Sequence, residues 1–288
     1  VISNEGDRAA VLLRKEFETK SGITEATVYM SGIGYSILSI NGKLADDCFL
    51  DPCNTQYSQT VLYRTFDVTG LLKSGAENAV AVELGNGFYN EEGGVWNWGS
   101  AEWKDDPKLL FWMIIRYEDG STQEIVSDTT WKGSVEGPTT FNSIYYGEFY
   151  DARLVKDGWD NVGYDDSSWS DAVAVKAPEG KLECQLEDPV RRTESFKPSE
   201  IKKLSDGSYV VYCPEMVAGW IALTIDGAKS GDTITITYSE KLNSDGSVQK
   251  LGGSDGVNSG WWPETYIMTD KYISAGDESV VFEPKFSY

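Results

Sequence analysis

Histidine is absent from the 288-residue sequence. It is the commonest general base near neutral pH and the commonest zinc ligand, so its absence excludes Ser-His and Cys-His nucleophile pairs and the usual zinc sites. Catalysis would have to use carboxylate pairs, lysine, tyrosine or metals bound by oxygen. The cysteines are also few: Cys48, Cys53, Cys184 and Cys213 show no CxxC spacing. Four cysteines allow three disulfide pairings, and free thiols are the simpler interpretation.

Basic residues are scarce, with 25 Lys+Arg against 46 Asp+Glu and a net charge of -21. Such a surface repels phosphate backbones and anionic lipid, so we expect neither nucleic acid nor membrane as a partner. A neutral ligand such as a sugar meets no such repulsion, and acidic loops can also hold calcium. The simpler interpretation is that the acidic surface only aids solubility.

Long apolar runs and a leader pattern are missing too. No run approaches the roughly 20 apolar residues of a membrane helix, and residues 1–8 show no signal-peptide pattern. The first residue is not Met, which fits a processed or shortened chain. Among compartments we favour the periplasm or the extracellular space over the cytoplasm.

The sequence does contain many segments with the residue pattern of β-strands. Alternating apolar and polar residues predict strands at residues 26–29, 35–40, 61–68, 79–84, 109–117 and 122–126. Turn signals about every ten residues are typical of a sandwich or jelly roll. The run at 109–117 is apolar on both faces, which predicts a central strand with Trp112 in the core. Only residues 69–73 suggest a helical turn, with Thr69 as its cap.

The chain divides into two predicted all-β units. Residues 1–178 form the first antiparallel jelly-roll domain, and residues 179–198, charged and punctuated by proline, form a connector. Residues 199–288 form a second β-sandwich, with strands at 209–213, 219–225, 233–238, 264–273 and 280–288. Since the last of these runs to the final residue, we expect the second sandwich to be incomplete. One large sandwich is the alternative.

An aromatic-rich segment at residues 85–103 is the main candidate site. The strand at 79–84 ends at Gly85-Asn86-Gly87, where glycine permits a sharp exit from the sheet. Aromatic faces bind the C–H surfaces of sugars while amides and carboxylates bind hydroxyls, and loops on a rigid scaffold often carry such sites. The candidate carbohydrate-binding residues of this segment are Asn86, Phe88, Tyr89, Trp96, Trp98 and Trp103. A second patch at residues 139–151 adds Asn142 and Tyr145. Alternatively, these aromatics plug the sandwich or contact another domain.

Two further groups contain closely spaced carboxylates. Glu91, Glu92 and Asn142 offer oxygen ligands for a calcium ion, but no EF-hand spacing supports this, and solvated charge is the simpler interpretation. Glu148 and Asp151 invite comparison with a glycosidase acid/base pair, but sequence neighbours seldom flank a sugar. We assign no catalytic residue.

Several segments resemble the N-terminal region of bacterial α-L-rhamnosidases. They are Leu50-Asp51-Pro52 with Tyr57, then VLYRTFDVT at 61–69, VELGNGFY at 82–89, FNSIYYGE at 141–148, YDAR at 150–153 and GWD at 158–160. Residues 219–221, 238–240 and 282–284 resemble the β-domain that follows in the same family. The segment at 95–103 departs from the family pattern, so no ligand specificity can be transferred to it.

The resemblance implies a galactose-binding-like jelly roll followed by a concanavalin-like sandwich. In that family the reaction takes place later, in an (α/α)6 barrel, and this sequence ends before any such barrel. The implied function is that of an accessory, carbohydrate-binding fragment of a glycoside hydrolase acting on rhamnose-containing glycans, inactive alone, with its own catalytic domain as partner. The alternative is a purely structural brace for that barrel.

Overall fold

The computed structural model describes residues 8–91, 100–249 and 268–287. Strands dominate these residues, and no α-helix occurs among them. Two short 3₁₀ turns, η1 (Thr69–Leu71) and η3 (Ala152–Leu154), interrupt the β structure. None of the helical segments in this described part of the chain could span a bilayer. The predicted all-β class is confirmed.

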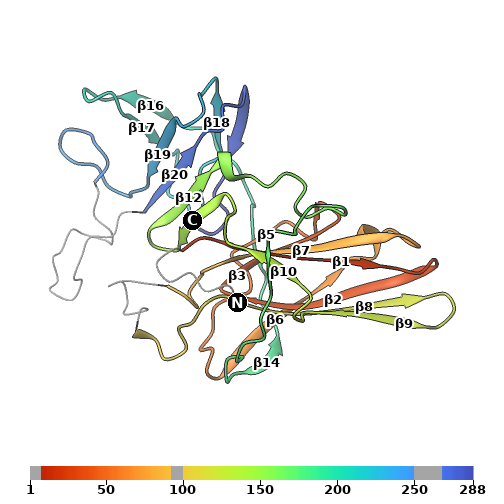
Figure 1. Ribbon diagram of the computed structural model, residues 1–288. Helices are drawn as coiled ribbons and strands as arrows, with labels where there is room; N and C mark the ends of the chain where they lie inside the picture. The colour runs from red at the N-terminus through yellow and green to blue at the C-terminus, as the bar shows by residue number, and fades with distance from the viewer. Residues whose placement is uncertain (1–7, 92–99, 250–267, 288) are drawn as a thin grey trace.

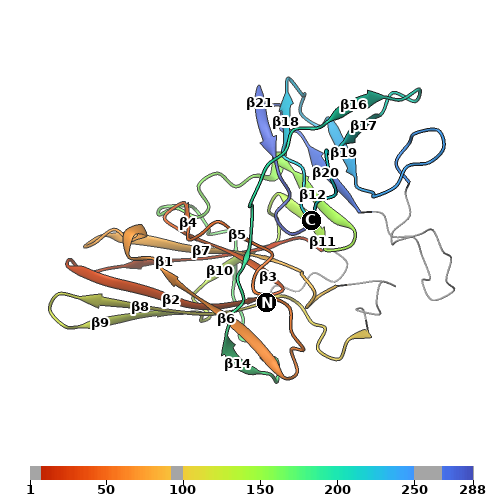
Figure 2. The same ribbon diagram turned by 180° about the vertical axis from the view of Figure 1, so that it is seen from behind.

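Two sheets packed face to face form a sandwich (Figures 1 and 2). The first has the order β13 (Ser170–Asp171), β10 (Lys132–Ser134), β1 (Val11–Glu18), β7 (Glu77–Gly85), β3 (Tyr35–Ile40) and β4 (Lys43–Leu44). The second has the order β14 (Lys181–Cys184), β6 (Thr60–Asp67), β2 (Ile23–Ile33), β8 (Lys108–Tyr117) and β9 (Thr122–Val126). Apart from β14, the neighbouring strands within both sheets are antiparallel.

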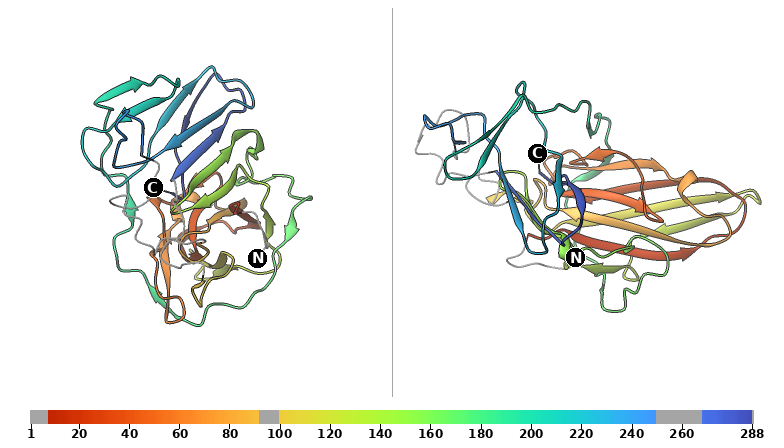
Figure 3. Two further views of the ribbon diagram at one scale, coloured as in Figure 1. Left: turned by 90° about the vertical axis from the view of Figure 1, so that its left-hand side faces the viewer. Right: turned by 90° about the horizontal axis from the view of Figure 1, so that it is seen from above.

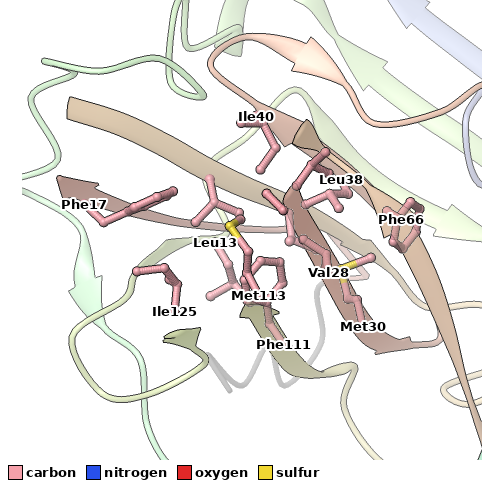
Figure 4. Close-up of a cluster of buried hydrophobic side chains, with 14 of the residues drawn as sticks. Leu13, Phe17, Val28, Met30, Leu38, Ile40, Phe66, Phe111, Met113 and Ile125 are labelled. Carbon is pink, nitrogen blue, oxygen red and sulfur yellow. The ribbon is translucent and has the colours of Figure 1, made fainter. Parts of the chain in front are cut away.

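The core lies between these sheets. Alternate side chains of each strand point inward, as the two-residue period of a strand requires. Figure 4 shows Val28 and Met113 of the second sheet meeting Leu13 and Leu38 of the first. Trp131, 1% exposed, closes the cluster and donates its indole N–H to the Val126 carbonyl at 2.8 Å.

The central-strand expectation for β8 was only partly right. Its inward residues, such as Met113, are buried, but Leu110 is 52% and Trp112 is 43% exposed. The prediction that Trp112 lies in the core is therefore wrong. An apolar run fits a strand covered on both faces, but no described element covers the outer face of this sheet at Trp112. The prediction that Thr69 caps η1 is also wrong, because Asp67 accepts from the Thr69 N–H at 3.0 Å instead.

A third sheet joins distant parts of the chain. Its order is β11 (Thr139–Ser143), β12 (Gly147–Asp151), β20 (Thr269–Ile273) and β19 (Thr233–Thr237). Strands β12 and β20 are parallel and lie side by side (Figure 3). Two small antiparallel pairs, β16 (Glu200–Lys203) with β17 (Tyr209–Tyr212) and β18 (Leu223–Asp226) with β21 (Ser279–Phe282), lie in the same region.

The segment predicted as a connector pairs with the sandwich. Strand β14 runs parallel to β6, and β15 (Val190–Arg191) pairs with β5 (Cys48–Phe49). The domain limits at residues 178 and 199 stay a prediction. The four cysteines are free thiols; Cys48 and Cys53 are half-buried, while Cys184 and Cys213 are exposed.

Candidate functional site

The loop that leaves β7 is held close to the neighbouring strand by glycine. Gly87 has φ +50°, and a Cβ there would lie 2.9 Å from the Gly34 carbonyl carbon. Gly34 has φ +65°, and its Cβ would lie 2.2 Å from the Gly85 carbonyl oxygen. A side chain at either position would collide with backbone, so glycine is required. The predicted sharp exit from the sheet is present at Gly87.

Two amides from the candidate list lock this loop onto β11. Asn142 Oδ1 accepts from the Asn86 N–H at 2.7 Å, and Asn142 Nδ2 donates to the Arg8 carbonyl at 3.0 Å. Asn86 Nδ2 donates to the same carbonyl at 3.0 Å, while its Oδ1 accepts from Asn90 at 2.8 Å. Asn86 is 3% exposed and Asn142 is fully buried. Both amides therefore have a donor and an acceptor engaged within the protein.

Glu91 extends this buried network. Its carboxylate accepts from Ser143 Oγ and from the Ile144 N–H, both at 2.9 Å, and pairs with Arg8 at 3.5 Å. Glu91 is fully buried, so these contacts compensate its lost hydration. Among the described residues, no group of three or more His, Cys, Asp or Glu side chains is arranged to hold a metal ion. The calcium hypothesis stays a prediction, and Glu92 lies outside the described residues.

The described aromatic candidates divide into one cluster around Tyr89 and one half-buried pair. Tyr89 is 2% exposed and packs edge-to-face on Tyr57 with ring centroids 4.9 Å apart, and half-buried Trp103 packs against the same cluster. Phe88 and Tyr145 are half-buried and meet edge-to-face at 6.2 Å. The remaining candidates, Trp96 and Trp98, lie outside the described residues. The sugar-binding role of the whole set stays a prediction.

A second buried polar cluster lies where the third sheet meets the sandwich. Glu148 on β12 accepts from the Lys285 and Phe286 N–H groups, each at 2.8 Å, and is fully buried. Asp270 on β20 accepts from the Glu148 N–H at 2.7 Å, and its other oxygen accepts from Tyr238 OH at 2.7 Å. Lys285 reaches back to Glu83 of β7 at 2.8 Å. This cluster ties β7, β12, β20 and the 285–287 segment together.

Burial dominates the electrostatics of this cluster. It raises the pKa of Glu148 to about 7, against the opposing effect of Lys285 and the two backbone N–H donors. Burial likewise raises the pKa of Asp270. Burial disfavours the charged form of Lys285, but the carboxylates of Glu83 and Glu148 outweigh it and raise its pKa.

Glu148 and Asp151 are not arranged to act on one substrate. Glu148 is enclosed by protein, whereas Asp151 pairs with Arg153 at 2.6 Å, and that ion pair lowers the Asp151 pKa. A glycosidase needs two carboxyl groups flanking one exposed bond. The contacts of these two side chains indicate structural roles instead.

Three partners in these clusters were missed by sequence reasoning. Arg8 supplies the carbonyl and guanidinium for the loop network, and Glu83 and Lys285 form the ion pair at the sheet junction. A charged residue within the apolar run at residues 79–84 was a usable signal for Glu83, since a buried acidic residue needs a partner. Nothing local in the sequence identified Lys285 as that partner.

Fold and site together define a β-sandwich protein whose second β region is fastened to the first through a shared sheet. The family model for the α-L-rhamnosidase N-terminal domain matches residues 21–194. The model for the bacterial α-L-rhamnosidase concanavalin-like domain matches residues 202–288. The chain belongs to the α-L-rhamnosidase family, in which it matches these two domains.

Relatives and solved structures agree with this assignment. An α-L-rhamnosidase of Formosa agariphila is 34% identical over 97% of this chain. The structure of α-L-rhamnosidase from Dictyoglumus thermophilum is 34% identical, with a TM-score of 0.86 over 98% of this chain. The Streptomyces avermitilis α-L-rhamnosidase complexed with L-rhamnose is 27% identical, with a TM-score of 0.86 over 97% of this chain. The chain spans 29%, 29% and 26% of these three proteins.

Proposed function

We propose that this chain is the accessory β region of an α-L-rhamnosidase and holds a neutral, rhamnose-containing glycan at the rim of its first sandwich. Hydrolysis of the rhamnoside would belong to a part of the protein outside these residues. Family membership supports the rhamnoside substrate, and so does the related Streptomyces enzyme crystallised with L-rhamnose. Such a protein would meet its glycans in the periplasm or outside the cell, with neither nucleic acid nor membrane as a partner.

The main support for the proposal is the aromatic pair of Phe88 and Tyr145, which is held by a rigid part of the fold. Phe88 and Tyr145 pack on the cluster around Tyr35 and Phe286, yet both remain partly exposed. The hydrogen bonds of Asn86 and Asn142 fix the two loops that carry these rings. Because the frame is set before binding, a sugar ring can stack at low entropic cost. Asn86, Asn142 and Glu91 then act as positioning residues.

Calorimetric titration with L-rhamnose, with and without added calcium, tests this function. We expect Phe88→Ala to weaken binding about tenfold, since it removes one stacking face. Phe196→Ala, at a 43% exposed phenylalanine in the 179–198 segment, is the matched control and should bind as the wild type does. Absence of heat from folded wild-type protein would contradict the proposal.

A second candidate function, bracing of a catalytic domain, rests on a separate observation. Exposed apolar side chains gather in residues 186–216, where Leu186 is 87%, Ile201 61% and Met216 81% exposed. Such surface is costly in water and suits a protein contact. Under this alternative, Leu186→Ser with Met216→Ser lowers self-association of the chain while L-rhamnose produces no heat.

A further inference from the structure

The outer face of the second sandwich sheet carries an uncovered apolar patch. Trp112 is 43% exposed, and its neighbours Leu110 and Val126 are 52% and 40% exposed. Strands β6, β2, β8 and β9 form the layer on the side away from β16–β21 in both views (Figures 1 and 2). The patch is therefore separate from the Phe88–Tyr145 rim and from the sheet junction.

The patch is built around a row of rings. Tyr29 on β2 pairs directly with Trp112 on β8, and their ring centroids are 5.6 Å apart. Tyr63 on β6 meets Tyr29 from the other side at 6.2 Å. Three adjacent strands thus hold one ring each, and the strand spacing separates the outer two backbones by about 10 Å. We call Tyr63, Tyr29 and Trp112 the outer aromatic row.

The scaffold fixes the row in place. Strand β2 pairs with β8 from Ile23 to Ile33, and with β6 on its other edge. The Trp112 indole N–H donates to Glu124 Oε2 at 3.2 Å, which orients the ring. Rings held by a sheet lose little freedom when a ligand arrives, so their contact area converts efficiently into affinity.

Hydrogen-bonding groups border the row. Neither the Tyr29 nor the Tyr63 hydroxyl has a hydrogen-bond partner among the described residues. Thr65 lies opposite Tyr29 in the register, and Glu124 lies beside Trp112. Ring faces for C–H groups, with hydroxyls and a carboxylate beside them, match the alternating surface of a sugar chain.

Charge narrows the choice of ligand. The net charge of -21 opposes anionic polymers, and it equally opposes a second copy of the same chain. An extended row rather than a closed pocket suits a polymer rather than a single sugar. We propose that the outer aromatic row binds a neutral, extended polysaccharide chain, independently of the rhamnose contact at the Phe88–Tyr145 rim.

Native gel electrophoresis in the presence of soluble xyloglucan, arabinogalactan or galactomannan tests this proposal. We expect at least one polysaccharide to retard the wild type, Trp112→Ala to lower the association constant about tenfold, and Trp112→Phe to retain part of it. Tyr209→Ala is the matched control, because Tyr209 is 60% exposed on β17 and lies outside the row. Thermal melting confirms that each variant is folded.

The outcomes separate this site from the rhamnose site. Trp112→Ala should leave the heat of L-rhamnose binding unchanged, and Phe88→Ala should leave the gel retardation unchanged. The proposal is overturned if no polysaccharide retards the wild type, or if Trp112→Ala and Tyr209→Ala are retarded alike. It is also overturned if the wild type dimerises in a concentration-dependent way that Trp112→Ala abolishes.

Discussion

At the residue scale, Glu148 makes several of the polar contacts that join the third sheet to the segment packed on the first sandwich. Its side chain accepts from two backbone N–H groups of the 285–286 segment, and its own N–H donates to Asp270. Its second oxygen, Oε1, is buried without a hydrogen-bond partner among the described residues. An ionised carboxylate in that position costs far more than a protonated one.

Stability should therefore depend on pH through Glu148. Its pKa rises from 4.5 in the unfolded chain to about 7 in the fold, so its contribution is fully present below about 4.5 and is lost as pH rises towards 7. The loss is about 3 kcal/mol. Glu148→Gln keeps an acceptor for the backbone N–H groups but cannot ionise. Urea unfolding between pH 4.5 and 7.5 should show the variant gaining on the wild type, and parallel profiles would refute the assignment.

At the element scale, the 285–287 segment packs on the end of β7 because residue 85 has no side chain. A Cβ on Gly85 would lie 2.5 Å from the Phe286 ring, whereas one on Gly70 in η1 would meet nothing within 4 Å. Phe286 is 1% exposed in that contact. Gly85 thus serves close packing between elements.

Gly85→Ala should loosen this contact. The inserted methyl group overpacks the junction, and we expect a loss of about 1–3 kcal/mol in the free energy of unfolding. Gly70→Ala is the control and should change stability by only a few tenths of a kcal/mol. Limited proteolysis should cleave the C-terminal segment of Gly85→Ala first. Equal stability of the two variants would show that Phe286 can shift freely.

Some strands and site residues could be predicted from the sequence, and others could not. The strand at 35–40 was predicted with its observed bounds, because its alternation and the Asn41-Gly42 turn are local signals. Trp112 was misplaced because periodicity reports which residues share a face, not whether that face is covered. For the site, Asn86, Asn142 and Glu91 were singled out and do lie together. Their engagement with Arg8 depends on a contact between distant segments that no local pattern encodes.

At the scale of the whole molecule, the third sheet makes two regions interdependent. Strands β11 and β12 come from the chain that precedes the 179–198 segment, and β12 pairs with β20 through Phe149↔Lys271, Tyr150↔Tyr272 and Asp151↔Ile273. Tyr272 and Phe282 share a cluster with Ala152 beneath this sheet. Neither region completes its structure without the other.

Thermal unfolding should therefore follow one transition. Far-ultraviolet circular dichroism and tryptophan fluorescence should report the same midpoint, since the shared sheet couples both regions. Asp270→Ala, which removes the acceptor for Glu148 and Tyr238, should separate the midpoints. Two transitions in the wild type would mean that the shared sheet contributes little coupling.

The parallel pairing of β12 with β20 also constrains how the protein is made. Glu148 and Asp270 are 122 residues apart, so a ribosome needs on the order of ten seconds between them. Throughout that interval the newly made β11–β12 hairpin presents an open edge, and open edges recruit other strands. We therefore expect translation speed and chaperone access to affect how much of this protein reaches its native state.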